Sequence, residues 1–496
     1  MKVIHVVPGI DGSVSGVSSC ILPLCDVLFA QGIETSLYLR KKGENIKLDC
    51  PIYDFPLLHI PLVSIKHSPK MLAELKKVCQ YSDVIHNHSL WLLPNVYPYW
   101  AAKGEKIKVV TSPHGTLSSW ALKHSRLKKL IFGTLLQYPA LKRTDMFHAT
   151  CEKEYEEIRA LGYKQAVAII PIGMEVPTRS EQLRVAGCEF PSATHSGAYW
   201  PEGLTTEGVA TPQDCQCDRK PQNTQKTQKE CQDIETTEHT EYTEGCCAQD
   251  CQCGNKTMEG ASRQFPVPSS QFPVLSSEQK GCDVIVLTDN KPLATCHLPL
   301  ATENERLKRI VFFGRIHKVK AVDHLVKAWG QVQESLPDWE LVIAGPDCGA
   351  KGELEAIIAE EQIPRVRFVG EINGQAKYDF LTEADIYVLP SHTENFGVTV
   401  AEALACGTPT IASQGTPWAG LETEKCGKWV PIGVEPLAEA LRELTSFTDD
   451  ERAAMGERGR AWIQRDFSWD GIGAKMKAAY AWLLGQGEKP DFVRVD

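Results

Sequence analysis

Two glutamates in the segment SHTENFGVTVAEALACGTP are the first candidates for chemistry. Glu394 and Glu402 are eight residues apart, so on one continuous helix they would lie about 80° away from a shared face. We therefore expect a helix that begins near Gly397, with Glu394 in the loop just before its N-terminus and Glu402 on its second turn. Free N–H groups at that N-terminus would bind a phosphate, while the two carboxylates could accept hydrogen bonds from a sugar and a ribose. The alternative is an acidic residue favoured by the helix dipole together with a surface glutamate.

Two cations and a histidine follow other predicted strands. The segment GRIHKVK places Arg315 and Lys320 just after a buried strand, where fixed positive charge would stabilise a leaving diphosphate. The segment SPHGTL places His114 in a glycine-containing loop after the strand IKVVT. Taken alone, each of these residues also suits an ordinary solvated loop, so their interpretation depends on the elements that carry them.

Those elements form two series of alternating strands and helices. Short β-branched runs alternate with amphipathic stretches from residue 1 to 178, and the same alternation begins again at Arg309. Such alternation predicts βαβ units around a parallel sheet, whose ligands bind beyond the carboxyl ends of the strands. We therefore expect α/β architecture with two Rossmann-like, doubly wound domains, at 1–178 and 306–485, and a tail at 486–496.

The composition agrees with two soluble domains. The chain has 496 residues, 43% of them hydrophobic, and a net charge of −10. Residues 1–178 alone are basic, with 21 Lys/Arg against 15 Asp/Glu, and we expect no nucleic-acid partner. The opening MKVIHVVPGIDG predicts a short strand rather than a leader, and no run approaches 18 apolar residues. We expect a cytoplasmic protein.

Residues 179–305 break the alternation. They are rich in Thr, Gln and Glu, hold ten of the 18 cysteines, and contain DCQC and QFPV twice each. Low hydrophobicity predicts a largely disordered insertion that is dispensable for catalysis, with one strand at 282–290. A metal or redox site is the alternative, and Cys247 and Cys251 have the spacing nearest to a zinc pair.

The other eight cysteines lie among apolar strand and helix patterns. Examples are Cys79, Cys151 and Cys406. We interpret them as small buried hydrophobic residues in a reducing compartment.

Taken together, the motifs resemble a known family. Over residues 1–178 and 306–485 the sequence is similar to family-4 retaining glycosyltransferases of the GT-B fold. The N-terminal sequence of bacterial members is similar to two segments of this chain, IHNHSLW and the HGTLSSWAL that follows it. The C-terminal resemblance rests on Gly314-Arg315, Lys320, Ala384-Asp385-Ile386, Pro390-Ser391, Glu394-Asn395-Phe396-Gly397, Glu402-Ala403 and Gly407-Thr408-Pro409.

This resemblance implies a role for each matched residue. Arg315 and Lys320 would hold the donor diphosphate, and Glu394 would hold the donor sugar. Glu402 would hold the nucleotide ribose, and His114 would reach the donor sugar from the N-terminal domain. The other implied donor-binding positions are Asn395, Phe396, Gly397, Gly314 and Gly16.

Four features depart from the family pattern. The first loop has Gly12, Ser15 and Gly16 where members usually have adjacent glycines. Ala321 follows the lysine where glycine is usual, and Ile172 stands where asparagine is common. The long insertion is the largest departure, but it leaves the matched motifs intact.

The resemblance implies a metal-independent hexosyltransferase that retains anomeric configuration. It would move a sugar from a nucleotide-sugar donor to a hydroxyl of a saccharide or lipid-linked acceptor, in cell-envelope, exopolysaccharide or glycolipid assembly. We expect no cofactor and no metal, because no Asp-x-Asp motif lies at a donor loop and side-chain cations would replace Mg²⁺. A nucleotide-sugar epimerase of similar fold and a non-catalytic binding protein are the alternatives.

The segment WALKHSRLKKLIF has two interpretations. Its cations could rest on anionic lipid at the inner face of the membrane, or its apolar face could pack on the core of a solvated helix. The apolar members are Trp120, Leu122, Leu127, Leu130, Ile131 and Phe132, and the cations are Lys123, Arg126, Lys128 and Lys129.

Overall fold

The computed structural model describes residues 1–9, 16–39, 46–56, 67–123, 125–177, 287–288, 291–292 and 306–495. The chain divides into two compact units, of which the larger contains both sheets predicted from the sequence. The smaller unit, Thr243–Arg306, is described chiefly by an antiparallel pair, β8 (Leu287–Thr288) with β9 (Lys291–Pro292). The expected strand at 282–290 is thus described at two residues. The expectations of disorder and of a metal at Cys247 and Cys251 lie outside the described residues.

The N-terminal sheet has the strand order β16-β7-β6-β5-β4-β1-β2-β3, and all of its pairs are parallel except β16 with β7. Its strands are β1 (Lys2–Val7), β2 (Glu34–Leu39), β3 (Ile52–Asp54), β4 (Val84–His88), β5 (Lys108–Ser112), β6 (Met146–Ala149), β7 (Ala166–Ile169) and β16 (Val493–Arg494). The helices between them are α1 (Gly16–Ala30), α2 (Pro69–Val78), α3 (Tyr97–Ala101), α4 (Ser119–Lys123), α5 (Arg126–Phe132), α6 (Tyr138–Leu141) and α7 (Glu152–Ala160). This domain also has two short 3₁₀ helices, η1 (Cys79–Tyr81) and η2 (Leu93–Asn95), and one π-helical turn, η3 (Gly133–Gln137).

Helices cover both faces of this sheet, as the alternation of its side chains requires. Ile4 and Ile85 face one hydrophobic cluster, which includes Met71 of α2. Their neighbours Val3 and Val84 face a second cluster on the other side of the sheet. Because both faces are buried, the strands read as continuous apolar runs, which is why the sequence predicts them well.

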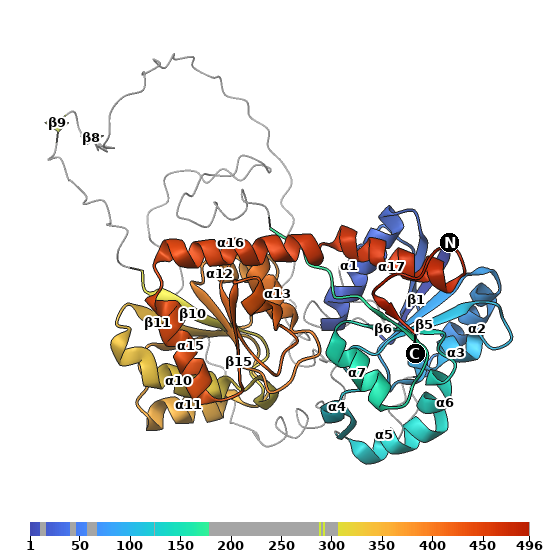
Figure 1. Ribbon diagram of the computed structural model, residues 1–496, viewed down its shortest axis with the longest axis horizontal. Helices are drawn as coiled ribbons and strands as arrows, with labels where there is room; N and C mark the ends of the chain where they lie inside the picture. The colour runs from blue at the N-terminus through green and yellow to red at the C-terminus, as the bar shows by residue number, and fades with distance from the viewer. Residues whose placement is uncertain are drawn as a thin grey trace, which may run out of the picture. The chain divides into compact units, whose positions relative to one another are not determined.

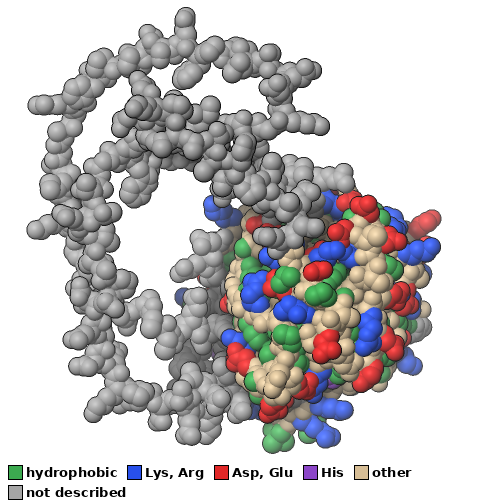
Figure 2. Space-filling view, turned by 90° about the vertical axis from the view of Figure 1, so that its left-hand side faces the viewer, with side chains coloured by type: hydrophobic (Ala, Val, Ile, Leu, Met, Phe, Trp, Pro, Cys, Tyr) green, Lys and Arg blue, Asp and Glu red, His purple; other side chains and the backbone are tan. Residues whose placement is uncertain are grey.

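The C-terminal sheet is wholly parallel, with the order β12-β11-β10-β13-β14-β15. Its strands are β10 (Lys308–Phe313), β11 (Trp339–Ala344), β12 (Val366–Gly370), β13 (Ile386–Leu389), β14 (Thr410–Ser413) and β15 (Gly427–Val430). Its helices and turns are η4 (Lys318–Lys320), α10 (Val322–Val332), η5 (Gln333–Ser335), α11 (Lys351–Glu360), α12 (Gln375–Thr382), α13 (Val398–Ala405), α14 (Gly420–Thr423), α15 (Val434–Ser446) and α16 (Asp449–Asp466). Figure 2 shows Lys/Arg and Asp/Glu side chains interspersed on one face of this domain, with hydrophobic side chains only scattered among them.

The end of the chain returns to the N-terminal sheet (Figure 1). Helix α17 (Trp469–Leu483) follows α16 and packs against α1, where Ile472 and Tyr480 join the cluster around Val3 and Leu24. Strand β16 then pairs with β7. Residues 486–496, expected as a tail, therefore contribute an edge strand to the first domain.

Each sheet has one point at which the strand order reverses. In the N-terminal sheet, β1 lies between β2 and β4; in the C-terminal sheet, β10 lies between β11 and β13. Ligands of doubly wound sheets bind at such a switch point, beyond the carboxyl ends of the strands. The segments that follow β10 and β13 are those in which the sequence placed Arg315, Lys320 and Glu394.

Candidate active site

Close backbone approach shapes the loop that carries Arg315. Gly314 has a φ of +154°, and its N–H donates to the carbonyl of Ala344 at 3.0 Å. Gly345 directly follows the neighbouring strand β11 and has a φ of +136°, and any Cβ there would overlap the carbonyl oxygen of Gly314. Arg315 is partly buried and makes no hydrogen bond or ion pair with the residues that the structure describes. Two glycines therefore let the ends of the two strands approach closely, directly before Arg315.

Lys320 is held by a short turn between β10 and α10. The turn η4 ends at Lys320, and Ala321 then takes a left-handed conformation, with φ +48° and ψ +40°, as the N-cap of α10. Glycine adopts this conformation without strain, which explains physically why a glycine is usual here in the family pattern. Ala321 keeps the turn despite its Cβ, and it is completely buried.

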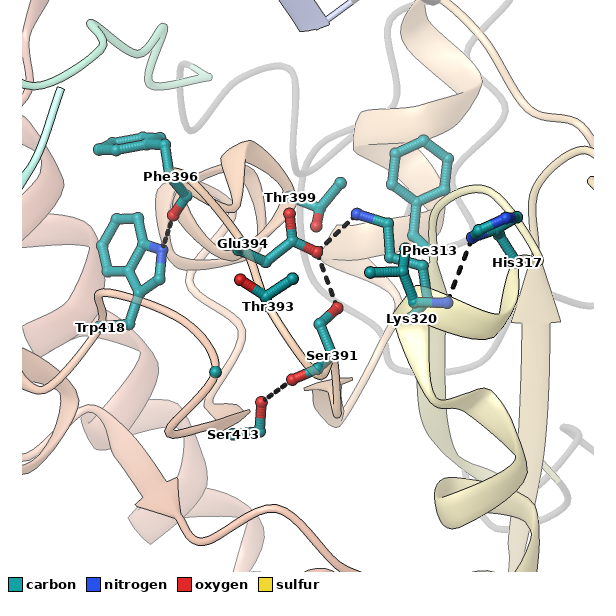
Figure 3. Close-up of polar contacts among 12 residues, drawn as sticks. Phe313, His317, Lys320, Ser391, Thr393, Glu394, Phe396, Thr399, Ser413 and Trp418 are labelled. Carbon is teal, nitrogen blue, oxygen red and sulfur yellow. Dashed lines mark hydrogen bonds and ion pairs between the residues drawn. The ribbon is translucent and has the colours of Figure 1, made fainter. Parts of the chain in front are cut away.

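Glu394 meets Lys320 across the switch point (Figure 3). The Nζ of Lys320 lies 2.6 Å from Oε1 of Glu394, and both side chains are mostly buried. The hydroxyl of Ser391 donates to the same oxygen at 2.7 Å. Partial burial strengthens such a charge-assisted contact relative to a surface ion pair. The structure thus brings two of the predicted site residues, 74 positions apart, into direct contact.

The helix that follows Glu394 begins where the sequence predicted. Gly397 is the N-cap of α13, with φ +78°, so the chain turns sharply into the helix. The carbonyl of Phe396 accepts a hydrogen bond of 2.6 Å from Nε1 of Trp418, and the Phe396 ring packs on that indole (Figure 3). The N–H groups at the very start of an α-helix have no acceptor within the helix, so a terminus such as that of α13 can bind an anion.

Glu402 lies on the second turn of α13 and pairs with a residue that sequence analysis did not identify. Nζ of Lys377, from α12, lies 2.7 Å from Oε1 of Glu402. Burial raises the pKa of the Glu402 carboxyl, and the nearby Lys377 opposes that shift. Glu402 is therefore separate from the Lys320–Glu394 pair and has its own cation, as its position on the helix suggested.

His114 lies in a strained loop that a buried glutamate holds in place. Its φ is +52°, and the next residue, Gly115, has φ +75°. The N–H of Gly115 donates to Glu154 at 2.7 Å, and the other oxygen of Glu154 accepts from the N–H of Thr150 at 2.7 Å. Glu154 is completely buried. Backbone strain that the surroundings maintain is a feature of ligand-contacting loops.

Contacts from the N-terminal domain reach the loop that carries Glu394. Nζ of Lys153 lies 2.7 Å from Oγ1 of Thr393 and donates to the carbonyl of Glu394 at 3.1 Å. The side-chain amide of Asn395 donates to Oγ1 of Thr150 at 2.9 Å. A Cβ on Gly115 would lie 2.9 Å from that of Asn395. The His114 loop thus packs directly against the Glu394–Gly397 segment.

Lys153 and Glu154 could not be recognised in the sequence. Their segment, TCEKEYEE, has the pattern of an ordinary charged amphipathic helix. The only available signal was its position directly after a predicted strand, the place where ligands of these sheets bind.

One further expectation, that the cysteines outside the insertion are buried, had a mixed outcome. Cys79 and Cys406 are buried as predicted, but Cys151 is partly exposed and its thiol donates to the carbonyl of Asn395 at 3.0 Å. Gly16 is the first residue of α1, while Gly12 and Ser15 lie outside the described residues. Ile172 is buried and joins the hydrophobic cluster of the C-terminal domain.

Two doubly wound domains with matched switch points define the GT-B fold, and solved structures share it. Sucrose-phosphate synthase from Thermosynechococcus elongatus superposes with a TM-score of 0.57 at 18% identity, covering 98% of this chain and 100% of that one. HepE from Anabaena, solved with UDP and glucose, gives a TM-score of 0.59 at 13% identity, covering 97% and 100%. At these identities the likeness establishes the fold alone.

The sequence matches define the family. Residues 14–176 match Glycosyltransferase Family 4, and residues 301–462 match Glycosyl transferases group 1. The chain belongs to the family-4, group 1 glycosyltransferases, as the motifs indicated.

Curated relatives match over about a third of this chain. A GDP-mannose-dependent monoacylated alpha-(1-6)-phosphatidylinositol monomannoside mannosyltransferase of Corynebacterium glutamicum is 34% identical over 176 residues, which are 32% of this chain and 42% of the relative. A D-inositol 3-phosphate glycosyltransferase of Corynebacterium jeikeium is 35% identical over 195 residues, 37% and 46% of the two chains. The chain therefore matches less than half the length of these relatives.

Proposed function

We propose that this protein is a retaining glycosyltransferase that moves a sugar from a nucleotide-sugar donor to a hydroxyl acceptor without a metal ion. The observation that carries the proposal is the contact between Lys320 and Glu394 at the switch point of the C-terminal sheet, with Arg315 on the same β10–α10 segment as Lys320. Cations and a carboxylate on neighbouring loops can bind the two halves of such a donor, its diphosphate and its sugar.

The reaction that fits this arrangement breaks the bond between the anomeric carbon and the phosphate oxygen. Negative charge grows on the departing diphosphate, and Arg315 and Lys320 stabilise it more in the transition state than in the ground state. The acceptor oxygen bonds to the anomeric carbon on the same face, and its proton passes to the departing phosphate. Glu394 orients the sugar through its hydroxyl groups, while Glu402 binds the ribose.

Relatives support a donor of this kind and a glycolipid or saccharide acceptor. The name of the Corynebacterium glutamicum relative specifies GDP-mannose and a phosphatidylinositol mannoside, and HepE was solved with UDP and glucose. We infer an acceptor of the same broad class here, in envelope, exopolysaccharide or glycolipid assembly.

A donor screen tests the proposal. UDP-, GDP- and dTDP-sugars are added to the purified protein with EDTA present, and thermal shift, sugar release and transfer are measured. A ligand at 100 times its dissociation constant should stabilise the protein by about 2.7 kcal/mol, and the stabilising donor should be turned over. Interconversion of the donor sugar without an acceptor would identify an epimerase. Binding without turnover of any donor would indicate a non-catalytic protein.

Glu394→Gln and Glu402→Gln are expected to impair different steps. Loss of a charged hydrogen bond to the ribose should weaken nucleoside diphosphate binding to Glu402→Gln by roughly 10- to 100-fold. Glu394→Gln should leave that affinity nearly unchanged and reduce sugar transfer instead. Isothermal titration with the diphosphate measures the first effect, and turnover measures the second. Equal losses of diphosphate affinity would contradict the separate roles.

We also propose that the protein works at the cytoplasmic face of a membrane, which it contacts through α5 and η3. Four apolar side chains there are more than half exposed: Leu127, Leu130, Ile131 and Leu135. The cations Lys123, Arg126 and Lys128 are exposed beside them, while Leu122 and Phe132 pack on the core. No helix in the described ranges is both long and apolar enough to cross a bilayer, so the proposed contact is peripheral. Apolar residues flanked by cations are complementary to anionic lipid.

Vesicle binding checks this contact. The double variant Leu127→Gln, Ile131→Gln should bind phosphatidylglycerol-containing vesicles about tenfold more weakly than the wild type, because less apolar surface enters the interface. Lys128→Glu should weaken binding to anionic but not to neutral vesicles. Leu161→Gln, which alters an exposed leucine of α7's C-cap, serves as the control. Equal binding by all variants in a sedimentation assay would refute the contact.

A further inference from the structure

Five histidines gather around the switch point of the N-terminal sheet. His5 lies on β1, His86 and His88 on β4, His148 on β6 and His114 directly after β5. All five are buried, and the first three have no exposed surface. Of the five, only His114 has an expected role, since the family resemblance implies that it reaches the donor sugar, so the other four buried imidazoles require an explanation.

The cluster does not have the geometry of a metal site. Ring nitrogens of His5, His86 and His88 come within 4.8 Å of one another. However, the rings of His86 and His88 are stacked, with centroids 4.1 Å apart and planes inclined by 30°. An imidazole lone pair lies in the plane of its ring, so stacked rings do not direct their lone pairs to one point.

Four of these histidines, His5, His86, His88 and His148, are neutral at neutral pH, so each of the four carries a single N–H. Burial lowers the pKa of His5 to about 3 and that of His148 to about 4. Burial also lowers the pKa values of His86 and His88 well below their usual range. Among the described residues, the ring nitrogens of His5, His86, His88 and His148 contact imidazole, hydroxyl and carbonyl groups rather than a carboxylate that could stabilise a charge.

The proton positions of one chain of contacts follow from its end. Nε2 of His148 lies 2.8 Å from the carbonyl oxygen of Ile170, which can only accept, so His148 carries its proton on Nε2. Its Nδ1 then accepts from the hydroxyl of Ser112, which in turn accepts from Nε2 of His86. Nδ1 of His86 accepts from the hydroxyl of Tyr480, on α17. Every nitrogen in this chain has a partner.

A second chain leads to the proposed site. Nδ1 of His5 lies 2.9 Å from Nε2 of His88, and Nδ1 of His88 lies 3.1 Å from Nε2 of His114. Nε2 of His5 is buried and has no hydrogen-bond partner among the residues that the structure describes. If protons pointed from His114 toward His5, this nitrogen would be a buried N–H without an acceptor. If they point toward His114, it is only an unused lone pair, the less unfavourable of the two.

We propose that His5 and His88 are positioning residues that act through His114, fixing its ring orientation and its Nδ1–H tautomer. His88 donates to Nε2 of His114, so the proton of His114 resides on Nδ1. A second proton on His114 would require both contacts to reverse. His114 therefore meets the donor sugar as a neutral N–H donor rather than as a base or a cation. The sugar contact rests on the proposed function, whereas the tautomer does not.

Side-chain ¹⁵N–¹H correlation spectra of the ¹⁵N-histidine-labelled protein at neutral pH test the tautomer without any activity. The His114 signals are identified by their loss in His114→Gln. We expect a protonated Nδ1 and an unprotonated Nε2. A protonated Nε2, or a fully protonated ring, would overturn the inference even in an active enzyme. The expected spectrum in a protein without transferase activity would refute only the proposed function.

A double-mutant cycle tests whether His88 acts through His114. His88→Leu should lower kcat by about 10- to 100-fold, the range seen when partners that orient functional histidines are removed, with little change in KM. His88→Asn, which restores an N–H close to the position of Nδ1, should recover most of that loss. In the His114→Ala background, His88→Leu should have no further effect. Equal losses in both backgrounds would show a structural role alone and overturn the proposal.

His86→Leu is the matched control for this cycle. His86 lies on the same strand and is equally buried, but its nitrogens contact Ser112 and Tyr480. Its effect on kcat should therefore be the same with and without His114. Melting temperatures and nucleoside diphosphate affinity, which depends on the C-terminal domain, report whether each variant is folded. A His86→Leu effect that disappears in the His114→Ala background would also overturn the assignment to His5 and His88.

Discussion

Replacing Arg315 or Lys320 with alanine is expected to lower the turnover of sugar transfer by roughly 100-fold or more. Each substitution removes a fixed charge from the departing diphosphate, and the loss of one preorganised transition-state contact costs about that much. Arg315→Ala should leave the melting temperature unchanged, because Arg315 has no ion pair or hydrogen bond among the described residues. Lys320→Ala should also lower the melting temperature, because it leaves the mostly buried Glu394 without its cation.

The same turn provides the control. Lys318 is two residues before Lys320 in η4, but its side chain is 75% exposed and pairs with Glu353 at 3.2 Å. Lys318→Ala should therefore retain wild-type turnover and stability, since an exposed ion pair contributes little. Turnover is measured with saturating donor and acceptor. Near-normal turnover in both Arg315→Ala and Lys320→Ala would disprove the assignment of the site.

Gly345→Ala is expected to produce the largest loss of stability. The added Cβ would overlap the carbonyl oxygen of Gly314, and φ at this position is +136°. Both the clash and the strain fall on backbone that cannot rotate away, so we expect a loss of about 2 to 4 kcal/mol. Thermal unfolding should show a fall in melting temperature of roughly 5 to 15 °C. Nucleoside diphosphate affinity should fall too, because Gly314 precedes Arg315.

Gly352→Ala separates this effect from a general intolerance to alanine. Gly352 lies in the first turn of α11, and apart from its own helix backbone and chain neighbours, no atom of the described residues would lie within 4 Å of a Cβ there. Alanine favours a helix over glycine by up to about 1 kcal/mol, so this variant should be as stable as the wild type or slightly more so. If Gly345→Ala melts at the same temperature as Gly352→Ala, the close approach of the two strand ends has no energetic importance.

The elements that carry the site were predictable because their signals are local. Strands buried on both faces appear as continuous apolar runs, as in Ile310–Phe312. The start of α13 was predictable because Gly397 and the apolar pattern after it are adjacent in the sequence. The roles of Arg315, Lys320, Glu394 and Glu402 came from the resemblance to the family.

The pairings were not predictable, because they depend on which strands become neighbours. The Lys320–Glu394 contact exists because β10 and β13 are adjacent, although α10, α11 and α12 separate them in the sequence. The His5–His88 contact depends in the same way on β1 lying beside β4. The expected C-terminal domain at 306–485 also included α17, which packs on the N-terminal sheet instead. Helical periodicity shows that a helix has an apolar face but not which sheet that face covers.

The return of α17 and β16 to the first sheet determines the order in which the protein can be completed on the ribosome. The N-terminal domain is synthesised first, but Val3, Leu24 and Val84 have no cover from α17 until the insertion and the C-terminal sheet have been translated. Domains of such chains usually fold as units during synthesis, beginning at the N-terminus. Here the domain made first is the last to be finished. Throughout translation its open apolar face is the surface on which a chaperone would act.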